Sequence, residues 1–384
     1  MGNCLSADSD NQVPVIRKHH RNPKETEVSQ VSLGPSVKED ELDLAPPETS
    51  GGDGGCRDSF QLDFVRQQQR SEGLGSLQCR FSSLANAQRH ASTKQRPLLV
   101  LDFVGDASTD KLFSHPLLVE AAESLFVVVR LPHDEKTTGK GSIRVMNENE
   151  AVEQVAEKFF SLASLCSTMV RGLQVCQCAV PVYLQLLLEE ETGRRRGERR
   201  VDREATFGML DSQVGEVEFG GLDGVLATRS GHIGRQPVVQ VTYDSTKLSY
   251  CNLVRYALQQ NVADTVYFQS NDEKTGARME LQRVDSGAEL VSFLGITIQP
   301  SVDAKRALRQ TMLRFVPLTD LQSTRANRLV HRGVFNEAMR LLSPRQGTIL
   351  MRSMQAKGLQ EVIDVPIGRA WLRLSGGEEA SNCT

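Results

Sequence analysis

The chain has 384 residues, which is enough for two or three domains. Charged residues make up 24% of it and hydrophobic residues 39%, which is ordinary for a soluble protein. The net charge of −3 argues against a nucleic-acid partner, and no apolar run is long enough to cross a membrane as a helix. The N-terminus also lacks the apolar stretch of a cleavable signal peptide.

The first six residues, Met1-Gly2-Asn3-Cys4-Leu5-Ser6, fit the pattern for N-myristoylation of Gly2 once Met1 is removed. One myristoyl chain binds a membrane only marginally, so a second signal is needed. Cys4 lies where palmitate can attach, and a nearby basic cluster can attract anionic lipid: Arg17, Lys18, Arg21 and Lys24. The pattern predicts a lipid anchor at Gly2 and Cys4 on the cytoplasmic face of a membrane. A chance match in a disordered tail is the alternative.

Residues 1–57 are expected to form a disordered, lipid-anchored tail, because they are rich in Ser, Asn, Pro and Gly and carry an acidic patch at 39–43. Residues 58–95 are expected to be a helix, over 59–70, followed by linker. Three folded parts are then expected, at 96–192, 201–300 and 301–374, and their fold class is α/β and α+β.

The part at 96–192 is expected to alternate strands and helices. The expected elements are a buried strand at 98–104, a helix at 117–125, a strand at 126–131, a helix at 151–165 and a strand at 179–188 that contains Val180-Pro181. This order resembles a thioredoxin-like fold, and Pro181 then corresponds to the family's cis-proline; an ordinary trans proline entering an edge strand is the alternative. Where that family has Cys-x-x-Cys, this chain has Gly105-Asp106-Ala107-Ser108, so the resemblance implies no dithiol chemistry here.

The eight cysteines show no Cys-x-x-Cys spacing, which favours reduced thiols in a cytosolic setting. Cys176-Gln177-Cys178 can be a redox pair, half of a metal site, or two small apolar thiols beside a strand, and the scattered remaining ligands favour the last. The arginines of 194–200 are expected at the tip of a basic hairpin. That tip is either solvated or in contact with a membrane or phosphate.

Several motifs follow one another between Glu204 and Phe268. They are Ala205-Thr206-Phe207, Asp223-Gly224-Val225, Thr228-Arg229-Ser230-Gly231, a predicted strand ending in Val241-Thr242-Tyr243-Asp244, and Ser249-Tyr250 at the start of a predicted helix. In this order they resemble methionine sulfoxide reductase A. The resemblance covers about 65 residues and implies a catalytic Cys at the start of a helix, where a thiolate attacks the sulfoxide sulfur.

In this register the catalytic Cys falls on Asp211, and a Glu that assists protonation of the sulfoxide oxygen falls on Glu216. A carboxylate is a poor nucleophile toward sulfur, so the resemblance implies a degenerate site at Asp211 and Glu216. Asp at this position is instead expected to cap the helix that follows. The family's aromatic pair falls on Ser212 and Gln213, and its later His-Asp-Pro-Thr and Gln-Tyr-Arg elements are missing.

From residue 303 onwards the composition predicts helices at 304–315, 318–330, 334–342 and 345–357. Their basic residues are expected on an exposed face that is either solvated or binds anions: Arg325, Arg328, His331, Arg332, Arg340, Arg345 and Arg352, with Asn327 among them. A turn is expected at 271–276.

Three functions are compatible with these motifs. The favoured one is a membrane-tethered binding or scaffold protein with a catalytically degenerate reductase-like domain, a protein partner, and no cofactor or metal. The second is an active peptide-methionine (S)-S-oxide reductase that uses a displaced thiol near Glu216, at Cys251, Cys176 or Cys178. The third is a structural protein that binds anionic lipid.

Overall fold

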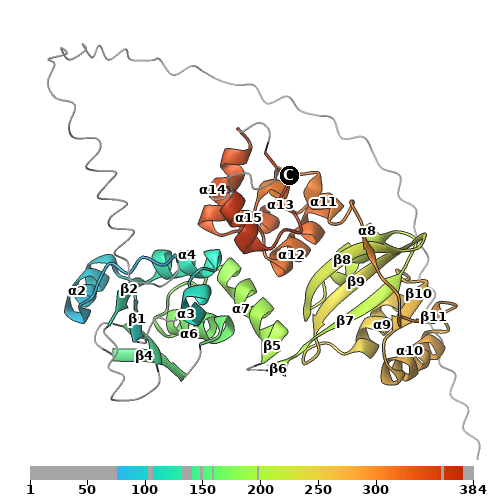
Figure 1. Ribbon diagram of the computed structural model, residues 1–384, viewed down its shortest axis with the longest axis horizontal. Helices are drawn as coiled ribbons and strands as arrows, with labels where there is room; N and C mark the ends of the chain where they lie inside the picture. Colours follow the sequence, from blue (N-terminus) through green and yellow to red (C-terminus); the bar gives the residue numbers. More distant parts are fainter. Residues whose placement is uncertain are drawn as a thin grey trace, which may run out of the picture. The chain divides into compact units, whose positions relative to one another are not determined.

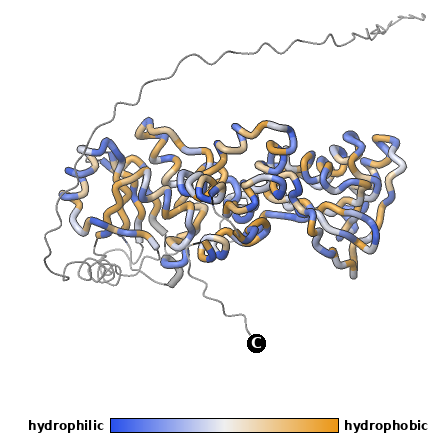
Figure 2. The backbone as a smooth tube through the Cα atoms, turned by 90° about the horizontal axis from the view of Figure 1, so that it is seen from above, coloured by the Kyte–Doolittle hydropathy of each residue, from blue (hydrophilic) through white to orange (hydrophobic). Residues whose placement is uncertain are grey.

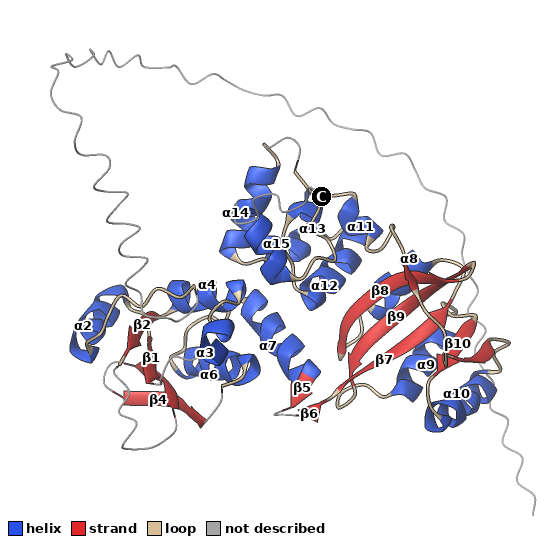
Figure 3. Cartoon of the chain, in the orientation of Figure 1, coloured by secondary structure: helices blue, strands red, loops and turns tan. Residues whose placement is uncertain are grey.

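The computed structural model describes residues 76–102, 107–131, 141–147, 150–157, 160–196, 199–355 and 359–374. All of them fall within one unit of the chain, Ser59–Thr384. The described residues form a mixed α/β protein with two mixed sheets and thirteen α-helices (Figure 3). The predicted lipid anchor at Gly2 and Cys4 and the predicted helix at 59–70 lie outside the described residues.

The first sheet has four strands in the order β2-β1-β3-β4. Its strands are β1 (Leu98–Asp102), β2 (Val127–Arg130), β3 (Gly141–Asn147) and β4 (Glu150–Glu157). β1 pairs parallel with β2 and antiparallel with β3. The helices of this part are α2 (Leu84–Lys94), α3 (Ala107–Leu112), α4 (Pro116–Leu125), α6 (Leu162–Val175) and α7 (Val182–Arg194). The predicted helix at 117–125 is confirmed, and so are the predicted strands, over Leu98–Asp102 for the one at 98–104, whose last two residues lie outside the described residues, and over Val127–Arg130 for the one at 126–131.

The helix predicted at 151–165 is wrong, because this stretch contains strand β4 and only the start of α6. Val152 and Val155 are three residues apart, which suggests a helix face. In β4 both nevertheless pack against the first core, the buried cluster that includes Leu99, Ile143 and Leu165. They do so because the register against β3 shifts beside Val145 and leaves Val152 as the extra residue of a bulge. In a regular strand, side chains three positions apart point to opposite faces of the sheet. The extra residue of the bulge turns both valine side chains toward the core.

The strand predicted at 179–188 is also wrong, since α7 begins at Val182 with Pro181 as its N-cap. The described residues contain no cis peptide bond, so the cis-proline interpretation of Pro181 is wrong. The peptide bond is trans, as in the alternative, but the proline precedes a helix and not an edge strand. The apolar run that suggested a strand contains Gln and is followed by Glu, and both residue types favour helix. The buried residues of α7 recur at helical spacing: Tyr183, Leu184, Leu186, Leu187 and Glu190. Within the predicted linker, α2 is likewise a helix.

The second sheet has six strands in the order β11-β10-β7-β9-β8-β12. The strands are β7 (Asp202–Gly208), β8 (Val225–Ile233), β9 (Gln236–Asp244), β10 (Thr265–Phe268), β11 (Glu289–Ser292) and β12 (Gln299–Pro300). Only the β10–β11 pair is parallel. The predicted basic hairpin is confirmed as β5 (Arg195–Arg196) and β6 (Arg199–Arg200).

Three helices belong to this sheet: α8 (Ser212–Phe219), α9 (Tyr250–Gln259) and α10 (Asn271–Val284). α9 and α10 pack side by side, next to β10 and β11 (Figure 1). The core is built around Phe207 of β7, whose ring stacks on Phe219 of α8 at 4.8 Å between centroids. The turn predicted at 271–276 is wrong because Ser270 caps α10 and two acids favour its first turn.

The C-terminal part is helical, as predicted, and has its own core. Its helices are α11 (Arg306–Arg309), the 3₁₀-helix η1 (Met312–Phe315), α12 (Asp320–His331), α13 (Phe335–Arg340), α14 (Pro344–Ser353) and α15 (Ile367–Leu374). The helix predicted at 304–315 is therefore two short pieces. The predicted basic face is wrong in part, since Asn327 is buried and Arg325 donates to the Gly220 carbonyl at 3.0 Å.

No helix among the described residues is long and apolar enough to span a membrane. Figure 2 shows apolar and polar residues interleaved along the folded chain rather than gathered in one continuous apolar stretch.

Candidate functional site

Asp211 lies between strand β7 and helix α8 and caps the helix. Its backbone is extended, with φ −132° and ψ 104°, and its carboxylate accepts a hydrogen bond from the Gln213 N–H at 2.9 Å. This contact satisfies one of the free N–H groups at the start of a helix and places a negative charge near the positive end of the helix dipole. The predicted N-cap is therefore confirmed.

A cavity of about 430 Å³ lies beside this helix start. It is lined by Leu210, Asp211 and Val214 and by two loops, at 261–264 and 286–288. Leu210 is 93% exposed, so the position before Asp211 presents an apolar side chain to solvent. The described residues that line the cavity include no Cys and no His, so they supply neither a thiol nucleophile nor an imidazole base.

Glu216 is 1% exposed and lies on another side of the same helix. One carboxylate oxygen accepts from the Ser230 N–H of β8 at 3.1 Å, and the other accepts from the Lys305 N–H at 2.8 Å. Glu216 does not line the cavity beside Asp211. The structure therefore does not bring Asp211 and Glu216 together: the first faces the cavity, and the second holds the chain that leads into α11.

Burial raises the pKa of Glu216 from 4.5 to about 7, and the nearby Lys305 charge and the two backbone donors oppose this rise. A carboxyl with such a pKa in a cleft is a candidate acid–base catalyst. Glu216, however, does not line the cavity beside Asp211, and both of its oxygens already accept backbone hydrogen bonds. Its raised pKa follows from enclosure between β8 and the C-terminal part.

The described cysteines lie away from the Asp211 cavity. Cys166 is buried in the first core, and Cys79, Cys176 and Cys178 pack against that core. Cys251 is on α9 and faces α10, because a Cβ built on Gly276 would lie 2.6 Å from its sulfur. Cys176 and Cys178 follow helix α6 and precede helix α7, so the expected neighbouring strand is absent there.

Burial also works against thiolate formation at three of these thiols. It raises the pKa of Cys79 to about 11, and it raises the pKa of Cys166 and of Cys176 as well, with Cys178 adding to the effect on Cys176. Such thiols are protonated near pH 7 and react slowly. Across the described ranges, no group of three or more His, Cys, Asp or Glu side chains is arranged to hold a metal ion.

Two further buried glutamates hold the C-terminal part to the first sheet and its helices. Glu120 of α4 accepts from the Ser343 hydroxyl at 2.6 Å and from the Arg345 N–H at 2.7 Å, both at the start of α14. Glu190 of α7 accepts from the Leu321 N–H at 3.1 Å, at the start of α12. The sequence analysis missed both residues. The available signal was a carboxylate within the apolar face of a helix, which needs a partner when buried.

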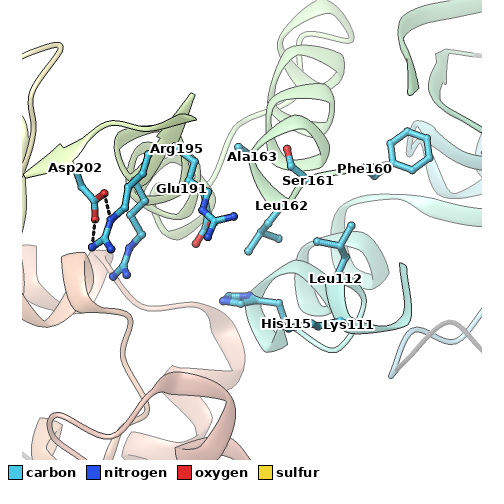
Figure 4. A pocket seen from close by; sticks show the side chains of 12 residues that line it. Lys111, Leu112, His115, Phe160, Ser161, Leu162, Ala163, Glu191, Arg195 and Asp202 are labelled. Carbon is cyan, nitrogen blue, oxygen red and sulfur yellow. Dashed lines mark hydrogen bonds and ion pairs between the residues drawn. The ribbon is translucent and has the colours of Figure 1, made fainter. Parts of the chain in front are cut away.

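A cavity of about 740 Å³ lies where α7 and the β5–β6 hairpin approach the start of α6 (Figure 4). His115 and Leu162 point into it from different helical segments. Arg194 donates to Glu190 at 2.8 Å and to Asp320 at 2.6 Å, and Arg200 donates to Asp202 at 2.6 Å. Arg194 and Arg200 are therefore paired with carboxylates, and the Arg194–Asp320 contact links α7 to α12. Lys111 and Arg195 also line the cavity, together with the acids Glu191 and Asp202.

No protein-family model matches this chain, and a search of curated proteins also gives no match.

Proposed function

We propose that the protein is a membrane-tethered binding or scaffold protein, whose methionine sulfoxide reductase A-like domain is catalytically inactive. The observation that carries the proposal is the set of hydrogen bonds made by Asp211 and Glu216, the two residues of the proposed degenerate site. The Asp211 carboxylate caps α8 through the Gln213 N–H, and the Glu216 carboxylate is occupied by the Lys305 and Ser230 N–H groups. Each residue has a structural role that leaves it without a part in sulfoxide chemistry.

The cysteine positions support the same proposal against the displaced-thiol alternative. Reduction of a sulfoxide needs a thiolate that attacks the sulfur and becomes a sulfenic acid, which a second thiol then reduces. None of the described cysteines lines the cavity beside Asp211. Cys251, the candidate in the same domain, packs toward α10 instead.

Turnover of a methionine sulfoxide peptide with dithiothreitol, measured on the purified full-length protein, tests this part of the proposal. We expect no turnover above the rate with dithiothreitol alone. A series in which Cys251, Cys176 and Cys178 are each changed to Ser provides the decisive comparison. Robust turnover that one of these substitutions abolishes would establish an active reductase.

The tether is tested separately, through the pattern at the N-terminus. We expect the intact mass of the protein from a eukaryotic cell to carry a myristoyl group, and a palmitoyl group where Cys4 is acylated. Gly2→Ala should remove the first group and release the protein from the membrane fraction, and Cys4→Ser should remove only the second. An unmodified N-terminus on membrane-bound protein would contradict the tether and favour direct binding to anionic lipid.

A further inference from the structure

A second cavity has an uneven charge distribution. It has a volume of about 630 Å³ and lies between α2, β2 and α4. Four cationic side chains line it, Arg80, Lys94, Arg96 and Arg345, against one acid, Glu123. A cavity wall with one sign of charge concentrates counter-ions and raises the local concentration of an oppositely charged ligand.

The single acid is already engaged. Glu123 accepts from the Arg345 side chain at 2.5 Å and from the Gln78 N–H at 3.4 Å. Arg80, Lys94 and Arg96 are exposed, and none of them makes a side-chain hydrogen bond or ion pair within the part of the chain that the structure describes. Three positively charged side chains therefore line this cavity without an acidic partner among the described residues.

The comparison with the cavity of Figure 4 shows why this matters. There, Arg194 and Arg200 are held by carboxylates at 2.6–2.8 Å, so an incoming anion would have to displace an acid to bind them. Lys111 and Arg195 also line that cavity, but two acids, Glu191 and Asp202, line it with them, against one acid in the second cavity. In the second cavity the donors of Arg80, Lys94 and Arg96 are available at once. A bound anion there would gain charge-assisted hydrogen bonds and would reduce the repulsion among the three cations.

We propose that this cavity binds a phosphomonoester group. The excess of three positive charges matches a group that carries about −1.5 to −2 charge at pH 7, better than it matches a single carboxylate. Guanidinium groups present paired donors to phosphate oxygens, and lysine adds a point charge. The Ser76 hydroxyl also lines the cavity, and Phe81 and Val127 form an apolar wall for the rest of an organic phosphate.

The group can belong to a soluble metabolite or to a lipid headgroup, and glycerol 3-phosphate and phosphatidic acid carry the same phosphomonoester in these two forms. Calorimetric titration of the full-length protein with glycerol 3-phosphate at low salt is the first arm. We expect saturable binding that weakens with salt. The triple variant R80A/K94A/R96A should weaken it about tenfold or more. Acetate at equal ionic strength should not compete.

The matched control removes three other exposed arginines that have no ion pair among the described residues, in the variant R235A/R278A/R283A. It lowers the net charge equally, so we expect less than about a twofold change in affinity if the cavity itself is the site. Equal weakening by both triple variants would overturn the proposal. If the first triple variant fails to fold, the single variant R96A replaces it, with R278A as its control.

The second arm is sedimentation with phosphatidic acid vesicles and with phosphatidylcholine vesicles, using the Gly2→Ala/Cys4→Ser background so that no acyl anchor contributes. Binding to phosphatidic acid that R80A/K94A/R96A abolishes identifies the lipid as a source. Binding of glycerol 3-phosphate alone identifies a soluble ligand. Absence of cavity-dependent binding in both arms would refute the site, whatever the reductase assay shows.

Discussion

Replacing Glu216 with Gln removes a buried negative charge while keeping the shape of the side chain. In the wild type, both oxygens of this carboxylate accept backbone hydrogen bonds, from Ser230 and Lys305. An amide offers only one oxygen, so one of these N–H donors loses its acceptor in E216Q. An unsatisfied buried donor costs about 1–3 kcal/mol.

The removal of the charge adds a second effect that depends on pH. Burial raises the pKa of Glu216 from 4.5 to about 7, so the folded protein holds this proton more tightly than the unfolded chain does. The resulting stabilisation is complete below about pH 4.5 and is lost as the pH rises to about 7. At 1.4 kcal/mol for each tenfold change in proton affinity, the loss amounts to about 3 kcal/mol.

Urea unfolding of wild type and E216Q between pH 4.5 and pH 8.5 measures both effects. Trp371 is the only tryptophan and lies on α15, so its fluorescence reports on the C-terminal part that Glu216 holds. We expect the free energy of unfolding of wild type, minus that of E216Q, to fall by about 3 kcal/mol as the pH rises through this range.

The matched control is Glu204→Gln, because Glu204 is an exposed carboxylate of strand β7 in the same sheet. It reports the effect of one unit of net charge without a change in a buried group. If the wild type and E216Q differ by the same free energy at every pH, then Glu216 does not hold a proton through its burial, and the account of its environment is wrong.

Asp211→Ala should destabilise the protein by about 1 kcal/mol in urea unfolding, whereas Asp211→Asn should change it little, because Asn also caps helices; equal effects would contradict the cap. Glu120→Ala should cost about 2–4 kcal/mol, since it leaves two donors at the start of α14 without an acceptor. Gly172→Ala should cost about 1–3 kcal/mol, because its Cβ would lie 2.6 Å from Val145. Gly347→Ala, at a helical site with open space, should instead stabilise by about 0.5–1 kcal/mol, and a loss there would refute the packing argument.

Local chemistry was sufficient to predict one feature of the site from the sequence. Asp211 was expected to cap a helix, and the structure confirms it, because this signal depends only on the adjacent backbone. Val152 and Val155, by contrast, were placed in a helix, because the bulge that turns both toward the core arises only when β4 pairs with β3. A short apolar run before Glu189 was likewise ambiguous between strand and helix.

The partners of the buried glutamates could not be predicted for a different reason. One donor to Glu216, the Lys305 N–H, lies 89 positions further along the chain, and the donors to Glu120 lie 223 and 225 positions further. No local pattern encodes such distances. A glutamate inside an apolar helix face indicates that a partner exists, but only the packed structure shows which backbone group it is.

The shared use of three glutamates bears directly on the proposed degenerate site at Asp211 and Glu216. Glu120, Glu190 and Glu216 come from three different helices, and each accepts a backbone N–H at or just before the start of a helix in the C-terminal part. Free N–H groups at a helix start need acceptors, and the dipole there favours negative charge. No catalytic motif includes Glu120 or Glu190, so chemistry does not explain why carboxylates occupy these positions. Glu216 makes the same kind of contact, and its burial therefore requires no catalytic role.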